Sequence, residues 1–140
     1  MKILLAVDGS KYTRKMLAYL STHEELFSNR NEYVALNVQT ELPLRARAAV
    51  GKEITKRYYQ DEADRVLGSV LKFLERHKLK TRGDWKTGAD GETIARYAEN
   101  GKFDLIVMGS RGHGALASLV LGSVAARVLA HCKVPVLLVR

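Results

Sequence analysis

The chain has 140 residues, 46% of them hydrophobic, and its 23 Lys and Arg outweigh 15 Asp and Glu for a formal net charge of +8. This length and apolar content suit one domain with one core, and the apolar runs are far shorter than the ~20 residues that cross a bilayer. The start, "MKILLAVDGS", lacks the apolar length of a signal peptide, and the single cysteine excludes an internal disulfide. We therefore expect one domain over residues 1–140, located in the cytoplasm and without membrane contact.

Apolar runs and helical periodicity alternate along the chain. Continuous apolar runs are typical of strands buried on both faces, and they predict strands at 2–7, 32–39, 103–108 and 134–139. A fifth, more polar strand is predicted at 79–88. Apolar residues at helical spacing predict helices at 10–26, 52–77, 90–101 and 118–132. Alternation of this kind implies an α/β fold with a parallel sheet covered by helices on both faces.

Local signals refine these elements. Ser10 and Asp90 are candidate helix N-caps, and the polar strand at 79–88 suggests a sheet edge. The long helix at 52–77 places Ile54 and Tyr58 on the same apolar face as Val66, Val70, Phe73 and Leu74. The basic stretch 40–51, which contains a proline, is expected to be irregular.

The positive charge does not by itself predict a nucleic-acid partner. Residues 41–82 hold eleven Lys and Arg against six Asp and Glu, but these follow a helical pattern typical of a solvated face. After Asp104 the chain has no carboxylate side chain, so an anion bound there would meet no side-chain repulsion. Burial of this stretch explains the same bias.

Residues 109–123, "GSRGHGALASLVLGS", form a glycine-rich turn between a predicted strand and a predicted helix. The lysine of a P-loop is missing, and the first strand-to-helix turn, "VDGSKYT", lacks the glycines of a dinucleotide fingerprint. Backbone N–H groups in such a turn and at a helix start form an anion-binding concavity, to which Ser123 can add a hydrogen bond. The alternative is a surface loop with a packing notch at Gly122.

The spacing Gly109, Gly112, Gly122 and Ser123 resembles the nucleotide-binding motif of the universal stress protein family, as do "ILLAVDGS" and "LGSVAARVLAHCKVPVLLVR" at the two ends of the chain. The resemblance covers the whole chain. It implies a single-domain, Rossmann-like fold of the adenine nucleotide alpha hydrolase type, with five parallel strands in the order 3-2-1-4-5. It also implies a cleft for ATP with Mg²⁺ or Mn²⁺, and a homodimer formed through residues 134–139.

Matching positions carry the family's binding roles to this chain. The phosphates would lie against main-chain groups of the glycine turn and the following helix, and the resemblance assigns this role to Gly109, Arg111, Gly112, His113, Gly114, Gly122, Ser123 and Val124. Met108 is a further residue expected to contact the nucleotide. Ala6 and Val38 match positions at the adenine, and Asp8 matches an acidic residue that contacts the ribose or holds the metal. Many relatives carry His where this chain has Asn37.

Ordinary structural roles compete with several of these assignments. Asp8 precedes Gly9 in a common turn pair, Arg111 could point into solvent, and His113 has no carboxylate following it to orient an imidazole as a base. We identify no residue that would orient an attacking group, so slow ATP hydrolysis at most is expected. The sequence favours a nucleotide-responsive regulator with an unidentified protein partner. The alternative is a nucleotide-independent scaffold of the same fold that binds an acidic or nucleic-acid partner.

Overall fold

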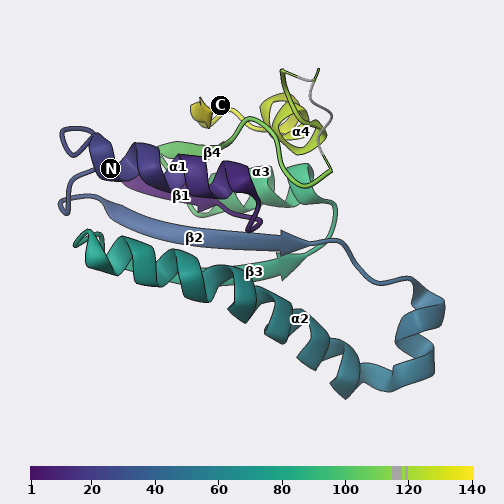
Figure 1. Cartoon of the computed structure of the whole chain (residues 1–140). Coiled ribbons are helices and arrows are strands. Elements are labelled where there is room, and N and C mark those ends of the chain that lie inside the picture. Colours follow the sequence, from purple (N-terminus) through teal and green to yellow (C-terminus); the bar gives the residue numbers. More distant parts are fainter. Residues whose placement is uncertain (115–117, 119) are drawn as a thin grey trace.

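The computed structural model describes residues 1–114, 118 and 120–140. Over these residues strands and helices alternate as β1 (Lys2–Ala6), α1 (Lys11–Thr22), β2 (Glu32–Gln39), α2 (Leu44–Arg76), β3 (Thr81–Thr87), α3 (Asp90–Asn100), β4 (Leu105–Gly109), α4 (Ser123–His131) and β5 (Val136–Val139). All strand pairs are parallel and the sheet order is β3-β2-β1-β4-β5 (Figure 1). The predicted α/β fold and strand order are confirmed.

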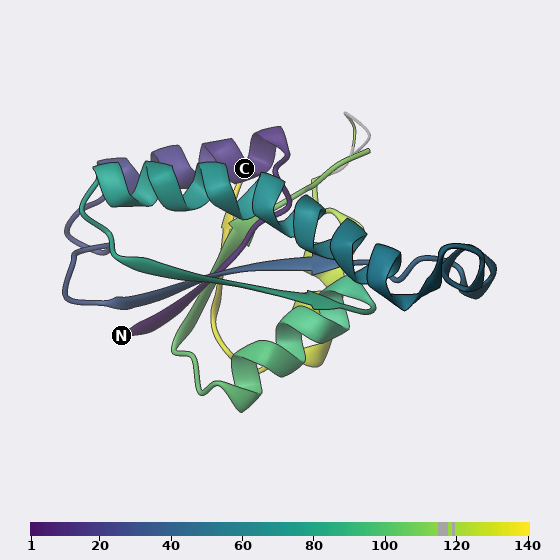
Figure 2. The same cartoon turned by 90° about the horizontal axis from the view of Figure 1, so that it is seen from below.

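Helices cover both faces of the sheet, with α1 and α2 on one side and α3 and α4 on the other (Figure 2). Side chains of successive strand residues point to opposite faces, so the central strand β1 supplies two cores. Ile3 and Leu5 pack with Val66 of α2, whereas Leu4 packs with Ile94 of α3. This burial on both faces explains why β1 and β4 are continuous apolar runs.

Helix α1 begins as predicted, because the Ser10 hydroxyl accepts a hydrogen bond from the Tyr12 N–H at 3.2 Å. It ends at Thr22, four residues earlier than predicted. The prediction that Asp90 caps α3 was wrong by one position: Ala89 is the N-cap and Asp90 is the first helical residue. A carboxylate there still lies in the first turn, where the helix dipole favours negative charge.

Residues 44–50 correct the prediction for the basic stretch, because they are helical and form the start of α2. Leu, Arg and Ala are strong helix formers, and they outweigh the loop signals of Pro43 and Gly51. The backbone leaves helical geometry only at Gly51, whose φ of 85° is in the left-handed region. The chain therefore turns sharply there (Figure 1).

The predicted buried face of the long helix was wrong at its first two members. Ile54 is 57% exposed and Tyr58 is 51% exposed, whereas Thr55 and Tyr59 are buried. The start of α2 extends past the end of the sheet in both views, so this part of the helix has no core to face on that side (Figures 1 and 2). We call residues 44–58 the α2 arm.

Helix α4 begins at Ser123, five residues later than predicted, because Gly122 is its extended N-cap. The Gly122 N–H donates to the Ser110 carbonyl at 2.7 Å, which fixes the helix start beside the end of β4. Among the described residues, no helix is long and apolar enough to cross a membrane.

Candidate functional site

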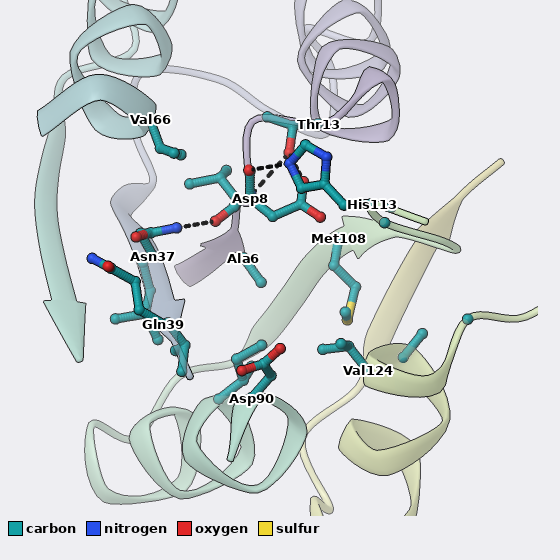
Figure 3. A pocket seen from close by; sticks show the side chains of 18 of the residues that line it. Ala6, Asp8, Thr13, Asn37, Gln39, Val66, Asp90, Met108, His113 and Val124 are labelled. Carbon is teal, nitrogen blue, oxygen red and sulfur yellow. Dashed lines mark hydrogen bonds between the residues drawn. The ribbon is translucent and has the colours of Figure 1, made fainter. Parts of the chain in front are cut away.

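A cavity of about 470 Å³ lies at the carboxyl ends of β1, β2 and β4 (Figure 3). The winding direction of the sheet reverses between β1 and β4, and ligands of open α/β sheets bind at such a crevice. The twelve residues that the sequence assigned to a binding site all line this one cavity: Ala6, Asp8, Val38, Met108, Gly109, Arg111, Gly112, His113, Gly114, Gly122, Ser123 and Val124. Segments far apart in the sequence thus form one site.

Asp8, directly after β1, uses one carboxylate oxygen in the turn that begins α1. Its Oδ1 accepts from the Ser10 N–H at 2.8 Å and from the Thr13 hydroxyl at 2.9 Å, and the Thr13 oxygen in turn accepts from the Asp8 N–H at 3.1 Å. This is the ordinary turn chemistry that competed with a ligand role. The other oxygen, Oδ2, faces Gly112. Turn formation therefore occupies half of the carboxylate.

The glycines after β4 allow the loop to lie close to neighbouring parts of the protein. A Cβ at Gly109 would come within 2.6 Å of the Tyr12 Cβ, and one at Gly112 within 2.5 Å of Asp8 Oδ2. A Cβ at Gly122 would lie 3.0 Å from the Arg111 Cα. Packing within the chain thus requires glycine at these three positions, whether or not a ligand approaches. The notch expected at Gly122 is present.

Gly114 differs from these glycines. Its φ is 70° and a Cβ there would meet nothing within 4 Å. Glycine is favoured by the backbone conformation at this position, and the adjoining space is open.

Two cationic or titratable side chains of the loop bind back onto the protein. The His113 ring nitrogen Nε2 donates to the Asp8 main-chain oxygen at 2.8 Å, which connects the loop after β4 to the turn after β1 (Figure 3). The Arg111 guanidinium carbon lies 4.9 Å from the centre of the Tyr12 ring. Arg111 therefore stacks on an aromatic ring rather than extending into solvent.

The amino terminus of α4 opens onto the cavity. Ser123 is its first helical residue and is exposed, and Val124 follows on the same wall. Free N–H groups and the helix dipole at this position favour an anion. The Ser123 hydroxyl adds a donor beside them.

The end of β2 contributes a buried amide that the sequence analysis noted only as a departure from relatives. The Asn37 Nδ2 donates to the Val7 carbonyl at 3.0 Å, so its Oδ1 is the remaining acceptor. This Oδ1 is buried and has no hydrogen-bond partner among the described residues. Asn37 as a whole is 4% exposed, and it lines the cavity. A buried acceptor without a donor costs about 1–3 kcal/mol.

Sequence reasoning missed two carboxylates of the cavity wall, Glu62 of α2 and Asp90 of α3. Burial raises the pKa of Asp90 above its usual range, and the Thr40 hydroxyl, which donates to it at 3.2 Å, opposes that rise. The Arg65 guanidinium, which donates to Glu62, lowers the pKa of that carboxyl. In the described residues no three metal-ligating side chains gather into one cluster. No sequence motif marks either carboxylate, because only the fold brings α2 and α3 to this edge.

A parallel sheet with a cavity at the carboxyl ends of its central strands is the arrangement in which open α/β folds bind ligands. The chain belongs to the universal stress protein family, whose model matches residues 1–140. It is 34% identical over 139 residues to Universal stress protein Slr1230 of Synechocystis sp., covering 99% of this chain and 42% of that protein. It is 31% identical over 140 residues to Universal stress protein MJ0531 of Methanocaldococcus jannaschii, covering 99% and 81%. The chain thus spans less than half of Slr1230.

Solved structures share the fold. Protein MJ0577 superposes with a TM-score of 0.81 at 30% identity, covering 99% of this chain and 94% of that one. A universal stress protein family protein from Arabidopsis thaliana with AMP bound gives a TM-score of 0.68 at 18% identity, covering 99% and 90%. A universal stress protein in complex with cAMP gives 0.63 at 20% identity, covering 100% and 97%. At 18% and 20% sequence identity, the AMP-bound and cAMP-bound proteins show only that the fold is shared.

Proposed function

We propose that the chain binds ATP with Mg²⁺ or Mn²⁺ in the cavity of Figure 3 and acts as a nucleotide-responsive regulator in the cytoplasm. The observation that carries this proposal is that all twelve predicted residues line a single cavity. Its volume of about 470 Å³ is within the ~300–1,000 Å³ typical of small-molecule sites. The AMP and cAMP complexes are of proteins that share the fold, so the choice of ATP rests on the residues of this chain.

The ends of β1, β2 and β4 supply the apolar surroundings that an adenine ring needs. Ala6, Val38 and Met108 offer apolar side chains at the cavity wall. The family resemblance assigns hydrogen bonds with the adenine to main-chain groups of Val38, which lines the cavity. We assign the base to this end of the cavity.

The glycine loop and α4 suit the triphosphate. Gly112, Gly114, Arg111 and Ser123 all line the cavity, and the donors that they carry are main-chain N–H groups, a guanidinium and a hydroxyl. Donors and a helix amino terminus gathered around one volume favour a multiply charged anion.

Asp8 is the residue we assign to the metal that accompanies ATP. Mg²⁺ commonly uses one or two carboxylates together with substrate phosphates and water. Oδ1 is held by Ser10 and Thr13, which fixes the direction of Oδ2 towards the loop. When bound, the ion would neutralise phosphate charge beside the carboxylates of the cavity.

Binding rather than turnover is the proposed activity. The His113 imidazole, the nearest candidate base, donates its Nε2–H to the Asp8 carbonyl and so holds the loop. Rapid phosphoryl transfer requires a group that orients the attacking water. We therefore propose slow hydrolysis at most.

A route from the cavity to the α2 arm gives the response to nucleotide a structural basis. Gln39 lines the cavity, and its side-chain amide donates to the Tyr59 carbonyl at 2.8 Å. The Leu42 N–H donates to the Tyr59 hydroxyl at 2.8 Å. A ligand that moves the end of β2 would therefore act on the helix that carries the arm.

The homodimer implied by the resemblance also remains a proposal. β5 is an edge strand of the sheet, and an edge presents unpaired backbone groups that another chain can extend. Two copies related by a two-fold axis would pair their β5 strands antiparallel.

Calorimetric titration of nucleotide-free protein with ATP, with and without Mg²⁺, tests the proposed function. Ser123→Ala removes a donor on the cavity wall from an exposed position, and we expect an affinity loss of about fivefold with unchanged melting temperature. Ser69→Ala on α2, outside the cavity, is the matched control. Gly122→Val is less suitable because its side chain would displace the loop itself. Absence of ATP binding by the unmodified protein would favour the nucleotide-independent scaffold.

A further inference from the structure

A second cavity, of about 420 Å³, lies between the α2 arm and the carboxyl end of β3. Among the described residues, none lines both this cavity and the one at the ends of β1 and β4. Its volume is also within the ~300–1,000 Å³ of small-molecule sites.

The break in α2 creates the concave shape of this cavity. Leu44 and Ala48 line it from before Gly51, and Lys56 and Tyr59 line it from after. Because the backbone at Gly51 has a left-handed φ of 85°, the two helical segments meet at an angle and enclose space between them. The carboxyl end of β3 forms the third side.

Apolar and aromatic side chains form the inner wall. The rings of Tyr59 and Trp85 have centroids 6.1 Å apart, and the indole N–H of Trp85 is directed to Gln60 Oε1 at 3.2 Å. Leu44, which is 73% exposed, and Ala48 lie on the arm side of the cavity. An exposed leucine beside two aromatic rings favours an apolar occupant, because burial of these surfaces is favourable.

Cations line the same cavity, and none of the described lining residues is a carboxylate. The cations are Arg47, Lys52 and Lys56. The Arg47 Nη2 lies 3.8 Å from the Glu41 Oε2, which is a long ion pair. The Arg47 Nε is buried and has no hydrogen-bond partner among the described residues. Glu41 thus pairs with Arg47 from outside the cavity, and no described lining residue supplies a negative charge for Lys52 and Lys56.

We propose that this cavity is a second ligand site, which takes an amphiphilic carboxylate. The acyl or aryl body would lie between Leu44 and the ring of Trp85, and the carboxylate would pair with Arg47 at the cationic side. A guanidinium can donate two hydrogen bonds to one carboxylate, and the two lysines add charge. This site does not require that the first cavity bind a nucleotide.

Trp85 is the only tryptophan of the chain, so its fluorescence reports on a side chain that lines this cavity. Full-length protein would be titrated with decanoate below its micelle concentration, with calorimetry for stoichiometry. We expect saturable binding of one decanoate per chain and a change in Trp85 emission. Decyltrimethylammonium has a similar chain and the opposite charge, and the three cations should make it bind more weakly.

A pair of double variants separates the cavity from general basic charge. Lys52→Gln/Lys56→Gln removes two lining cations, and we expect decanoate affinity to fall about tenfold. Arg45→Gln/Arg57→Gln removes the same charge from exposed arm positions outside the cavity, and affinity should stay within about twofold of the unmodified protein. Equal losses in both double variants, tighter binding of decyltrimethylammonium, or no saturable decanoate binding would each overturn the proposal.

Discussion

Replacement of Gly112 by alanine tests how tightly the glycine loop is held against the turn after β1. The new Cβ would come within 2.5 Å of Asp8 Oδ2, so the carboxylate must turn or the loop must move. Turning the carboxylate weakens the two hydrogen bonds that its Oδ1 accepts from Ser10 and Thr13. At about 0.5–1.5 kcal/mol for each bond, the expected loss in the free energy of unfolding is about 1–3 kcal/mol.

For a chain of this length, about 1 kcal/mol corresponds to about 4 °C in melting temperature, so Gly112→Ala should melt about 4–12 °C lower by circular dichroism. Gly68→Ala is the control: a Cβ there meets nothing within 4 Å inside α2, and alanine should stabilise the helix by about 0.5–1 kcal/mol. In an Asp8→Ala background, Gly112→Ala should cost less, because the clashing oxygen is gone. A melting temperature unchanged by Gly112→Ala would refute the contact and the loop geometry built on it.

Three further outcomes follow from the same structure. Asp8→Asn should retain the turn, because an amide oxygen can still accept hydrogen bonds from Ser10 and Thr13. It should abolish the gain in ATP affinity that Mg²⁺ provides, as measured by calorimetry. An unchanged effect of Mg²⁺ would show that Asp8 is not part of the metal site. Burial, followed by the hydrogen bond to Asp84, raises the pKa of Tyr97 above its usual range, so stability from this group is complete below about pH 10 and is lost as the pH rises through the folded-state pKa. Tyr97→Phe should therefore lose less stability than the unmodified protein in melts between about pH 9 and pH 11, and an equal loss would contradict the assignment. Val136→Pro should yield monomers in light scattering if β5 forms the dimer. The Pro135 and Val139 carbonyls accept hydrogen bonds from the β4 side, so the Val136 N–H faces the free edge, and proline removes this donor. A persistent dimer would place the interface elsewhere.

The strand positions were predictable because buried parallel strands require nearly continuous apolar residues. "KILLAV" and "FDLIVM" have this pattern, and both became central strands. The order of the strands came from the resemblance to the family, since periodicity does not determine which strands are neighbours. Ser10 succeeded as a cap because a hydroxyl next to a helix start acts locally.

The errors have different causes, since helix propensity outweighed a turn signal at one place and tertiary structure outweighed the local pattern at two others. Pro43 and Gly51 indicated a loop, yet "LRARAAV" between them is helical, and the apolar Ile54 and Tyr58 are exposed because α2 extends past the sheet there. At α4, apolar residues predicted an early helix start, but the hydrogen bond from Gly122 to Ser110 determines where the helix begins.

In the candidate site, too, the loop was predictable from the sequence, whereas residues brought together by the fold were not. The glycine spacing located the loop, although the structure shows that packing against Tyr12 and Asp8 already requires glycine there. The carboxylates Glu62 and Asp90 were not predictable, because each reaches the cavity only through the packing of its helix on the sheet.

Amide chemical shifts of isotope-labelled protein during titration with Mg²⁺ and ATP test the proposed site most directly. The account predicts saturable changes at the main-chain groups that line the first cavity, above all at Val38, Gly112 and Ser123. Residues that line only the second cavity, Trp85 among them, should change little, apart from Tyr59, whose carbonyl accepts from Gln39. A titration without saturable changes at these amides, or with its largest changes outside this cavity, would contradict the account.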